Sequence, residues 1–212
     1  FLRALPTDTG MAFVLVQHLD PTHETILTDL LARATTMPTS QVEDGTVVRP
    51  DHVYVIPPNH SLTISGGMLR LGSRDSTHGQ HLPIDSFLGS LADDLGARAI
   101  GVILSGTGSD GTLGLRAIKS AGGVTFAQDE RSAQHAGMPH SAVVAGAVDL
   151  VLPASEIAAE LARIARHPYV ESPATSRGDA DPAPERDDLR QILLILRSAT
   201  GTDFQGYKPA TV

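Results

Sequence analysis

The sequence contains no cysteine and no tryptophan, and aromatic residues make up only 4% of its 212 residues. Without cysteine the chain forms no disulfide, offers no thiol nucleophile and provides no cysteine-ligated zinc, and the default expectation is a cytoplasmic location. With so few aromatic side chains, a surface that stacks nucleobases or encloses a quaternary ammonium group is not expected.

Positive charge and long apolar runs are also scarce. The 16 lysines and arginines are outnumbered by 24 aspartates and glutamates, which leaves a formal net charge of −8. This balance argues against nucleic acid and against an anionic membrane as partners. No apolar run approaches the roughly 20 residues that a membrane-spanning helix needs, so we expect no membrane insertion.

A strand–loop–helix–strand pattern over residues 99–129 organises the chain. Residues 99–104 and 124–127 are short apolar runs typical of buried strands, and apolar residues at helical spacing over 113–121 predict a helix between them. Such a βαβ unit crosses over right-handed and makes a parallel sheet. The intervening loop contains three glycines and one carboxylate, Asp110, at the carboxyl end of a strand, where open α/β sheets place their chemistry.

The rest of the chain divides into a domain, a linker and the start of a second domain. We assign residues 1–166 to one α/β domain, 167–187 to a solvated linker rich in Pro, Asp, Ser and Arg, and 188–212 to the beginning of another domain. Within the first domain, further strands are predicted at 12–17, 53–56 and 147–152, a hairpin at 62–71, and helices at 84–95, at 141–145 and, capped by Ser155, at 157–164.

The glycine-rich loop supports two interpretations. Residues 106–111, GTGSDG, form a literal GxGxxG between a strand and a helix, and Asp129 follows the next strand, as in a dinucleotide-binding unit. Against this, the charge of Asp110 would face the pyrophosphate at the helix N-terminus. The alternative is a tight turn that needs glycine for backbone reasons, with Asp110 as a helix cap.

A second candidate is a metal site around His18, Asp20 and His23. Histidines and carboxylates at short spacing can hold zinc or iron, and further histidines occur at His60, His78 and His81. The spacing fits no tight zinc signature, and Pro21 breaks the helix that would place the ligands on one face. A solvated His23 and a structural turn at Asp20 are the simpler interpretation, and we expect no metal.

The third candidate pairs two strand ends. His18 follows the strand at 12–17 and Asp110 follows the strand at 99–104, so a parallel sheet would bring both to its carboxyl edge. A carboxylate there can orient an imidazole that acts as general base. Ser105 and Ser109 share the Asp110 loop, but neither lies in a nucleophile-elbow context. The alternative for His18 is a half-buried histidine bonded to a loop carbonyl.

Several segments of the sequence together resemble the catalytic domain of chemotaxis protein-glutamate methylesterases of the CheB type, over about residues 1–166. The similar segments are VLVQHLDP (14–21), VEDGTVVRPDHVYVIPPNHSL (42–62), HLPID (81–85), IGVILSGTGSDGTLGLRAIKSAGG (100–123), FAQDE (126–130) and GMP (137–139). The resemblance implies a three-layer α/β/α sandwich with a mostly parallel, doubly wound sheet and a small β-hairpin.

The resemblance also implies a Ser-His-Asp mechanism with His18 and Asp110 as the catalytic histidine and aspartate. The family's serine lies in a G-A-S-x-G-G turn after its first strand, which would precede Phe1, so this chain alone is expected to be inactive. Thr107, Gly108 and Met138 are expected in the substrate pocket. Thr107 stands where Met is usual in the family, and His140 stands where Arg is usual.

The function implied is hydrolysis of glutamate methyl esters on chemoreceptors, together with deamidation of glutamines, without metal or organic cofactor. The expected partners are the methylated cytoplasmic helices of chemoreceptors and signalling-kinase modules. The alternatives are a non-catalytic receptor-binding signalling module and, with less support, a dinucleotide-binding oxidoreductase. The segment at 188–212, DLRQILLILRSATGTDFQGYKPATV, resembles the start of a CheR-type methyltransferase, as in fused methylesterase–methyltransferase proteins.

Overall fold

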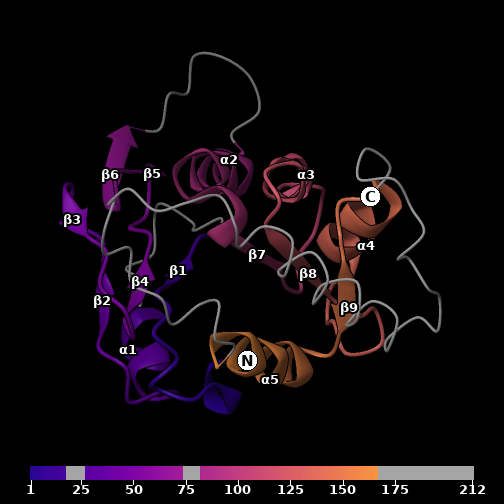
Figure 1. The fold of residues 1–212 in the computed structure, drawn as a ribbon, viewed down its shortest axis with the longest axis horizontal. Helices are drawn as coiled ribbons and strands as arrows, with labels where there is room; N and C mark the ends of the chain where they lie inside the picture. Colours follow the sequence, from indigo (N-terminus) through magenta and orange to yellow (C-terminus); the bar gives the residue numbers. More distant parts are fainter. Residues whose placement is uncertain (18–26, 74–81, 167–212) are drawn as a thin grey trace, which may run out of the picture. The chain divides into compact units, whose positions relative to one another are not determined.

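Parallel strands form the framework of the protein (Figure 1). The computed structural model describes residues 1–17, 27–73 and 82–166. The chain divides into two compact units, Phe1–Ser172 and Pro173–Val212, and every described residue belongs to the first. The predicted linker and second domain, at 167–212, therefore lie outside the described residues.

Six strands form two parallel sheets of three, ordered β1-β4-β2 and β7-β8-β9. This confirms the predicted α/β class with parallel pairing. Among the described strands, β1 pairs only with β4, and β7 pairs only with β8. The single parallel sheet that the sequence predicts is therefore observed as two three-stranded sheets. The bounds are β1 (Phe13–Leu15), β2 (Thr39–Gln41), β4 (Val53–Val55), β7 (Ile100–Ile103), β8 (Val124–Gln128) and β9 (Leu150–Leu152).

A small antiparallel sheet contains the predicted hairpin. Strand β5 (His60–Ser65) pairs with β6 (Met68–Ser73), and β3 (Thr46–Val47) pairs with the other side of β6. Gly66 and Gly67 form the turn with φ values of 58° and 69°, which suits the tight turns that match the twist of a hairpin. The hairpin was predicted correctly because two consecutive glycines interrupt two alternating runs.

The helices follow the predicted apolar periodicity, except at two N-termini. Helix α4 begins at Gly137 rather than 141, because Met138 and Pro139 are buried and proline needs no N–H acceptor in a first turn. Helix α5 begins at Ala154 after Pro153, so Ser155 lies inside it and is not its cap. The helices are η1 (Leu2–Ala4), α1 (Leu27–Ala32), α2 (Pro83–Leu95), η2 (Gly96–Arg98), α3 (Thr112–Ser120), α4 (Gly137–Val144) and α5 (Ala154–Ala165).

Two apolar clusters cover opposite sides of the strands. One gathers side chains of α2, α3 and the hairpin, and the other forms under α5. Alternation distributes the strand residues between them: Phe13 of β1 and Val102 of β7 pack in the α5 cluster, whereas Val14 and Ile103 pack in the α2–α3 cluster. Strands β1 and β7 therefore share both clusters, as two strands of one layer between helices would.

Candidate active site at the end of strand β7

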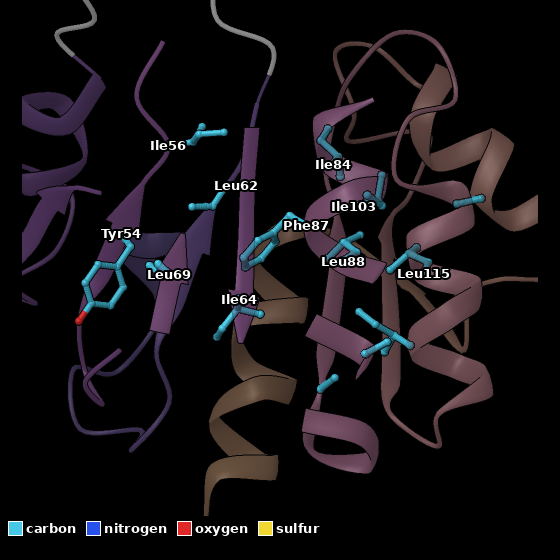
Figure 2. Packing of buried hydrophobic residues seen from close by; sticks show 14 of the residues in the cluster. Tyr54, Ile56, Leu62, Ile64, Leu69, Ile84, Phe87, Leu88, Ile103 and Leu115 are labelled. Carbon is cyan, nitrogen blue, oxygen red and sulfur yellow. The ribbon is translucent and has the colours of Figure 1, made fainter. Parts of the chain in front are cut away.

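Asp110 lies in the loop between β7 and α3 and is only 4% exposed. Gly111 follows it with a φ of 92°, and a Cβ there would lie 2.4 Å from Cδ1 of Ile103 and 2.9 Å from Cγ2 of Ile84. Both the positive φ and the close approach require glycine. The loop can therefore pack closely against Ile103 of β7, and the Asp110 carboxylate is buried beneath the surface of the protein. In Figure 2, Ile84 and Ile103 lie beside each other at this point.

The Asp110 carboxylate caps helix α2. Its Oδ2 accepts a hydrogen bond from the N–H of Ile84 at 3.1 Å, and its Oδ1 accepts one from the N–H of Asp85 at 2.8 Å. Helix α2 has no cap of its own, because Leu82 has no acceptor side chain and Pro83 has no N–H. The prediction that Asp110 would cap a helix holds for α2 and not for its own helix α3, whose N-cap is Gly111.

The Asp85 carboxylate in turn binds the N-terminus of α3, the helix that follows Asp110. Its Oδ1 accepts a hydrogen bond from the N–H of Gly114, in the first turn of α3, at 2.8 Å. Burial raises the pKa of the Asp85 carboxyl above its ordinary value, and the charge of Asp110 raises the pKa further. The N–H groups of Gly114, Gly111 and Leu113 act in the opposite direction. The N-terminus of α2 thus binds the Asp110 carboxylate, and the N-terminus of α3 binds the Asp85 carboxylate.

The first half of the loop packs against the segment that leads into α4. The N–H of Gly106 donates to the carbonyl of His135, and the N–H of Met138 donates to the carbonyl of Gly106, both at 2.9 Å. A Cβ on Gly137 would lie 3.1 Å from the amide nitrogen of Gly108, and a Cβ on Gly106 would lie 2.3 Å from Sδ of Met138. Small residues are needed on both sides of this contact.

The three residues predicted to form a substrate pocket are therefore close in space. Met138 is buried beneath the loop at 8% exposure, whereas Thr107 and Gly108 are exposed on it. His140, which the resemblance places where Arg is usual, lies with Nδ1 2.7 Å from Oε1 of Glu130, and both side chains are more than half exposed. The proximity agrees with a shared pocket, whose role in binding stays a prediction.

The described hydrogen bonds of the two loop serines are structural ones. The hydroxyl oxygen of Ser105 accepts the backbone N–H of His135 at 2.9 Å, and the N–H of Ser105 donates to Oε1 of Gln128 at 2.9 Å. These bonds give Ser105 a structural role that joins the loop to β8. Ser109 offers its carbonyl to the N–H of Thr112 at the start of α3.

The dinucleotide interpretation finds no support at its two acidic positions. Asp110 is buried against α2. The Asp129 carboxylate accepts the N–H groups of Arg131 and Ser132, both at 3.1 Å, as well as the Ser132 hydroxyl, which lowers the pKa of Asp129. An acid engaged by its own turn is not presented to a ribose.

Several predicted residues lie outside the described part of the chain. They include His18, the proposed general base, and the candidate metal ligands Asp20, His23, His78 and His81. Residues 1–17, 27–73 and 82–166 contain no group of three or more His, Cys, Asp or Glu that could hold a metal. His60, the remaining histidine of that set, bonds the carbonyl of Pro58 through Nδ1 at 2.7 Å.

No helix among the described residues is long and apolar enough to cross a membrane.

Asp85 is the site residue that sequence reasoning missed. Its one visible signal is an acidic side chain in the first turn of a helix, just after Pro83. That signal predicts a favourable contact with its own helix dipole. It does not reveal that the carboxylate serves another helix 29 residues further along the chain.

The amino-acid sequence is similar to one protein family and to several known proteins. Residues 1–161 match the CheB methylesterase family. A protein-glutamate methylesterase/protein-glutamine glutaminase of Myxococcus xanthus is 34% identical over 169 residues, covering 78% of this chain and 49% of that protein. An uncharacterized 104.1 kDa protein of Rhodobacter capsulatus is 38% identical over 204 residues, covering 88% of this chain and 21% of that protein.

A solved structure resembles the fold described above. The CheB methylesterase catalytic domain of Thermotoga maritima superposes with a TM-score of 0.69 and 30% identity, covering 77% of this chain and 88% of that domain. The chain spans half or less of the length of the two relatives above, but most of this single domain.

Proposed function

Because the chain belongs to the CheB methylesterase family, we propose that the full-length protein hydrolyses methyl esters of glutamate side chains on chemoreceptors. The names of its relatives pair this activity with a protein-glutamine glutaminase, and we include deamidation of glutamines in the proposal. The observation that carries it is the buried Asp110, whose carboxylate is fixed by two backbone N–H groups at the carboxyl end of β7.

The proposed mechanism assigns each residue one task. A serine hydroxyl attacks the ester carbonyl while His18 removes its proton, and the collapse of the tetrahedral intermediate expels methanol, which takes that proton from His18. Water then hydrolyses the acyl-serine by the same base, which releases the glutamate carboxylate and restores the serine. Asp110 holds the His18 imidazole in one tautomer and stabilises the imidazolium. None of these steps calls for a cofactor.

We further propose that the serine lies upstream of Phe1, in the turn that follows a strand inserted between β1 and β7. The N–H of Phe13 donates to His52 and the carbonyl of Ala99 accepts from Val124, so these residues face β4 and β8. Because peptide groups alternate along a strand, those of Val14, Ile100 and Val102 face away from these neighbours. The two outward edges share both apolar clusters, as a parallel strand between them requires.

The substrate and partner assignments rest on the family. We propose methylated cytoplasmic helices of chemoreceptors as substrate, signalling-kinase modules as further partners, and the cytoplasm as location. We also propose that residues 188–212 begin a CheR-type methyltransferase after a linker at 167–187. The match to the Rhodobacter capsulatus protein, which covers 88% of this chain, supports a continuation beyond the esterase domain.

The test measures methanol released by the full-length protein from receptor carrying labelled methyl groups. We expect Asp110→Asn and His18→Ala each to lower kcat by on the order of 10³–10⁴-fold, because an unoriented or absent base leaves only binding and oxyanion stabilisation. Asp44→Asn is the matched control, since the Asp44 carboxylate also accepts a backbone N–H, from Leu71 at 3.0 Å, but on the hairpin.

Two results would refute the assignment. One is methanol release that is unchanged in His18→Ala or Asp110→Asn. The other is wild-type protein that binds methylated receptor and releases no methanol, which would identify a non-catalytic binding module.

A further inference from the structure

Two carboxylates and two helix N-termini form a closed ring beside the candidate active site. Asp110 accepts N–H groups from the first turn of α2, and Asp85 in that turn accepts the N–H of Gly114 in the first turn of α3. Helix α3 follows Asp110 after one residue, Gly111. The ring therefore returns to the residue at which it starts.

The Asp110–α2 contact and the Asp85–α3 contact depend on each other, because neither helix has a capping side chain at its own N-cap. The N-cap of α2 is Leu82 and that of α3 is Gly111, and neither makes a side-chain cap hydrogen bond. If the Asp85 carboxylate is removed, the N–H of Gly114 loses its acceptor and the start of α3 is released. The loop that carries Asp110 is then anchored at one end only.

We propose that Asp85 is a positioning residue for Asp110, holding its carboxylate in the orientation that the catalytic histidine needs and adding a second negative charge to its surroundings. This inference rests on the proposed function. It assigns Asp85 no contact with the substrate. Asp85 acts through the α3 N-terminus and through its charge.

The charge effect has a direction that can be measured. A negative charge near an imidazole favours the imidazolium and raises its pKa. Replacing Asp85 by asparagine removes one of two neighbouring negative charges, so the pKa of a histidine held by Asp110 should fall. The hydrogen bonds of the ring hold the two carboxylates close together, and the charge of Asp110 contributes to the raised pKa of Asp85.

Other charged groups on the elements packed against Asp85 are engaged elsewhere or, like Asp93 on α2, are exposed to solvent. On α3, Arg116 donates to the carbonyl of Ala145 and Lys119 pairs with Asp149. On α2, Asp94 accepts the N–H groups of Gly66 and Gly67 in the hairpin turn. On β5, the ring of His60 bonds the carbonyl of Pro58. Among residues 1–17, 27–73 and 82–166, Asp110 is therefore the charged group that shifts the pKa of Asp85.

The experiment compares full-length wild type with Asp85→Asn, Asp85→Ser and Asp85→Ala, by kcat and KM for methanol release over a range of pH. Asp94→Asn and Asp94→Ala are matched controls, because Asp94 lies on the same helix and also accepts backbone N–H groups. Asn and Ser both retain an acceptor oxygen without the charge, so the pH measurement does not depend on the folding of one variant. Thermal unfolding is recorded for all variants.

We expect Asp85→Ala to lower kcat about tenfold or more with KM changed less than about twofold, since misorientation acts on the chemical step. In Asp85→Asn and Asp85→Ser, the acid limb of kcat/KM should move to lower pH by about half a unit, because that limb reports the free enzyme's base. The Asp94 variants should lose stability without either change.

Two outcomes would overturn the inference. One is an acid limb that coincides with that of wild type in both uncharged variants. The other is a loss of kcat in Asp85→Ala no greater than in Asp94→Ala. Failure of the proposed function is recognised separately: wild type would then release no methanol, or His18→Ala or Asp110→Asn would release it at the wild-type rate, whatever the Asp85 variants do.

Discussion

At the scale of single residues, carboxylates connect segments that are far apart in the sequence. Asp149 is an example outside the candidate site. Its Oδ2 accepts the N–H and the hydroxyl of Thr125 at 3.0 and 2.8 Å, and its Oδ1 lies 2.9 Å from Nζ of Lys119. Burial alone would raise the pKa of Asp149, but the Lys119 ammonium and the Thr125 donors outweigh it and hold the pKa below its ordinary value.

This lowered pKa predicts a pH-dependent stability. A carboxyl whose pKa is lower in the folded than in the unfolded protein stabilises the fold above its ordinary pKa of 3.8, and the stabilisation disappears as the pH falls through the folded value. Asp149→Asn should lower the free energy of unfolding by about 1 kcal/mol at pH 7, the partly exposed pair being screened by water. Denaturant unfolding at pH 7 and near pH 2 measures this.

The loss in Asp149→Asn should shrink as the solution is acidified toward pH 2, because wild type then carries a neutral carboxyl as well. Asp93→Asn on the exposed face of α2 is the control and should change stability little at either pH. An equal loss for Asp149→Asn at both pH values would contradict the electrostatic explanation.

The sequence predicts the importance of a single residue where that importance follows from the residue's place between a strand and a helix. Asp110 was identified because a carboxylate before a helix and after a strand is unusual in a glycine-rich loop. Its actual partners, the N–H groups of Ile84 and Asp85, are 26 and 25 residues away, and no local pattern encodes them. The same holds for Asp85, whose acceptor role exists only after α2 and α3 have packed.

At the scale of elements, the α2–α3 contact determines how closely the two helix N-termini approach. Gly114 on α3 is buried against α2, where a Cβ would lie 2.4 Å from Cβ of Leu88 and 3.2 Å from the carbonyl oxygen of Asp85. Figure 2 shows Leu88 next to Leu115 at this contact. Apolar periodicity predicted both helices, but it could not predict which residue of one touches the other.

Two glycine-to-alanine substitutions test this contact. Gly114→Ala should destabilise the protein by about 1–3 kcal/mol, because the added methyl group collides with Leu88 and forces the helices apart. Gly89→Ala, in the middle of α2 where a Cβ meets nothing within 4 Å, should stabilise it by about 0.5–1 kcal/mol, since alanine favours the helix. Denaturant midpoints of both variants measure the two effects.

The contrast between the two variants is informative because both replace a helical glycine by the same residue. If Gly114→Ala were as stable as wild type, the helices would have room to separate, and the close packing that places Asp85 beside Gly114 would not be required.

Helix starts were the least predictable feature of the elements. Ser155 has the chemistry of a cap, yet α5 starts before it, after Pro153, whose carbonyl accepts the N–H groups of Glu156 and Ile157. In α4 the burial of Met138 against Gly106 extends the helix toward the loop. In both cases the boundary depends on packing partners that the local sequence does not specify.

At the scale of the whole first unit, the sequence predicted the order of strands and helices and two local strand pairings, β5 with β6 and β7 with β8, but not the pairings between more distant strands. Short apolar runs indicate buried strands without naming their neighbours. The pairing of β3 with β6, and the division of the parallel strands into two sheets, depend on contacts between distant segments. The outward-facing edges of β1 and β7 agree with the first strand that the family resemblance places before Phe1.

These edges give the last prediction, for amide hydrogen exchange in the full-length protein. If the strand that leads into the serine turn inserts between β1 and β7, the amides of Val14 and Val102 gain carbonyl partners and should exchange about as slowly as those of Leu15 and Ile103. The latter amides face β4 and β8 by the alternation along each strand and serve as internal controls. Exchange of Val14 and Val102 more than about 100-fold faster than the controls would show that no strand occupies this position, and the nucleophile would then have to reach His18 and Asp110 by another route.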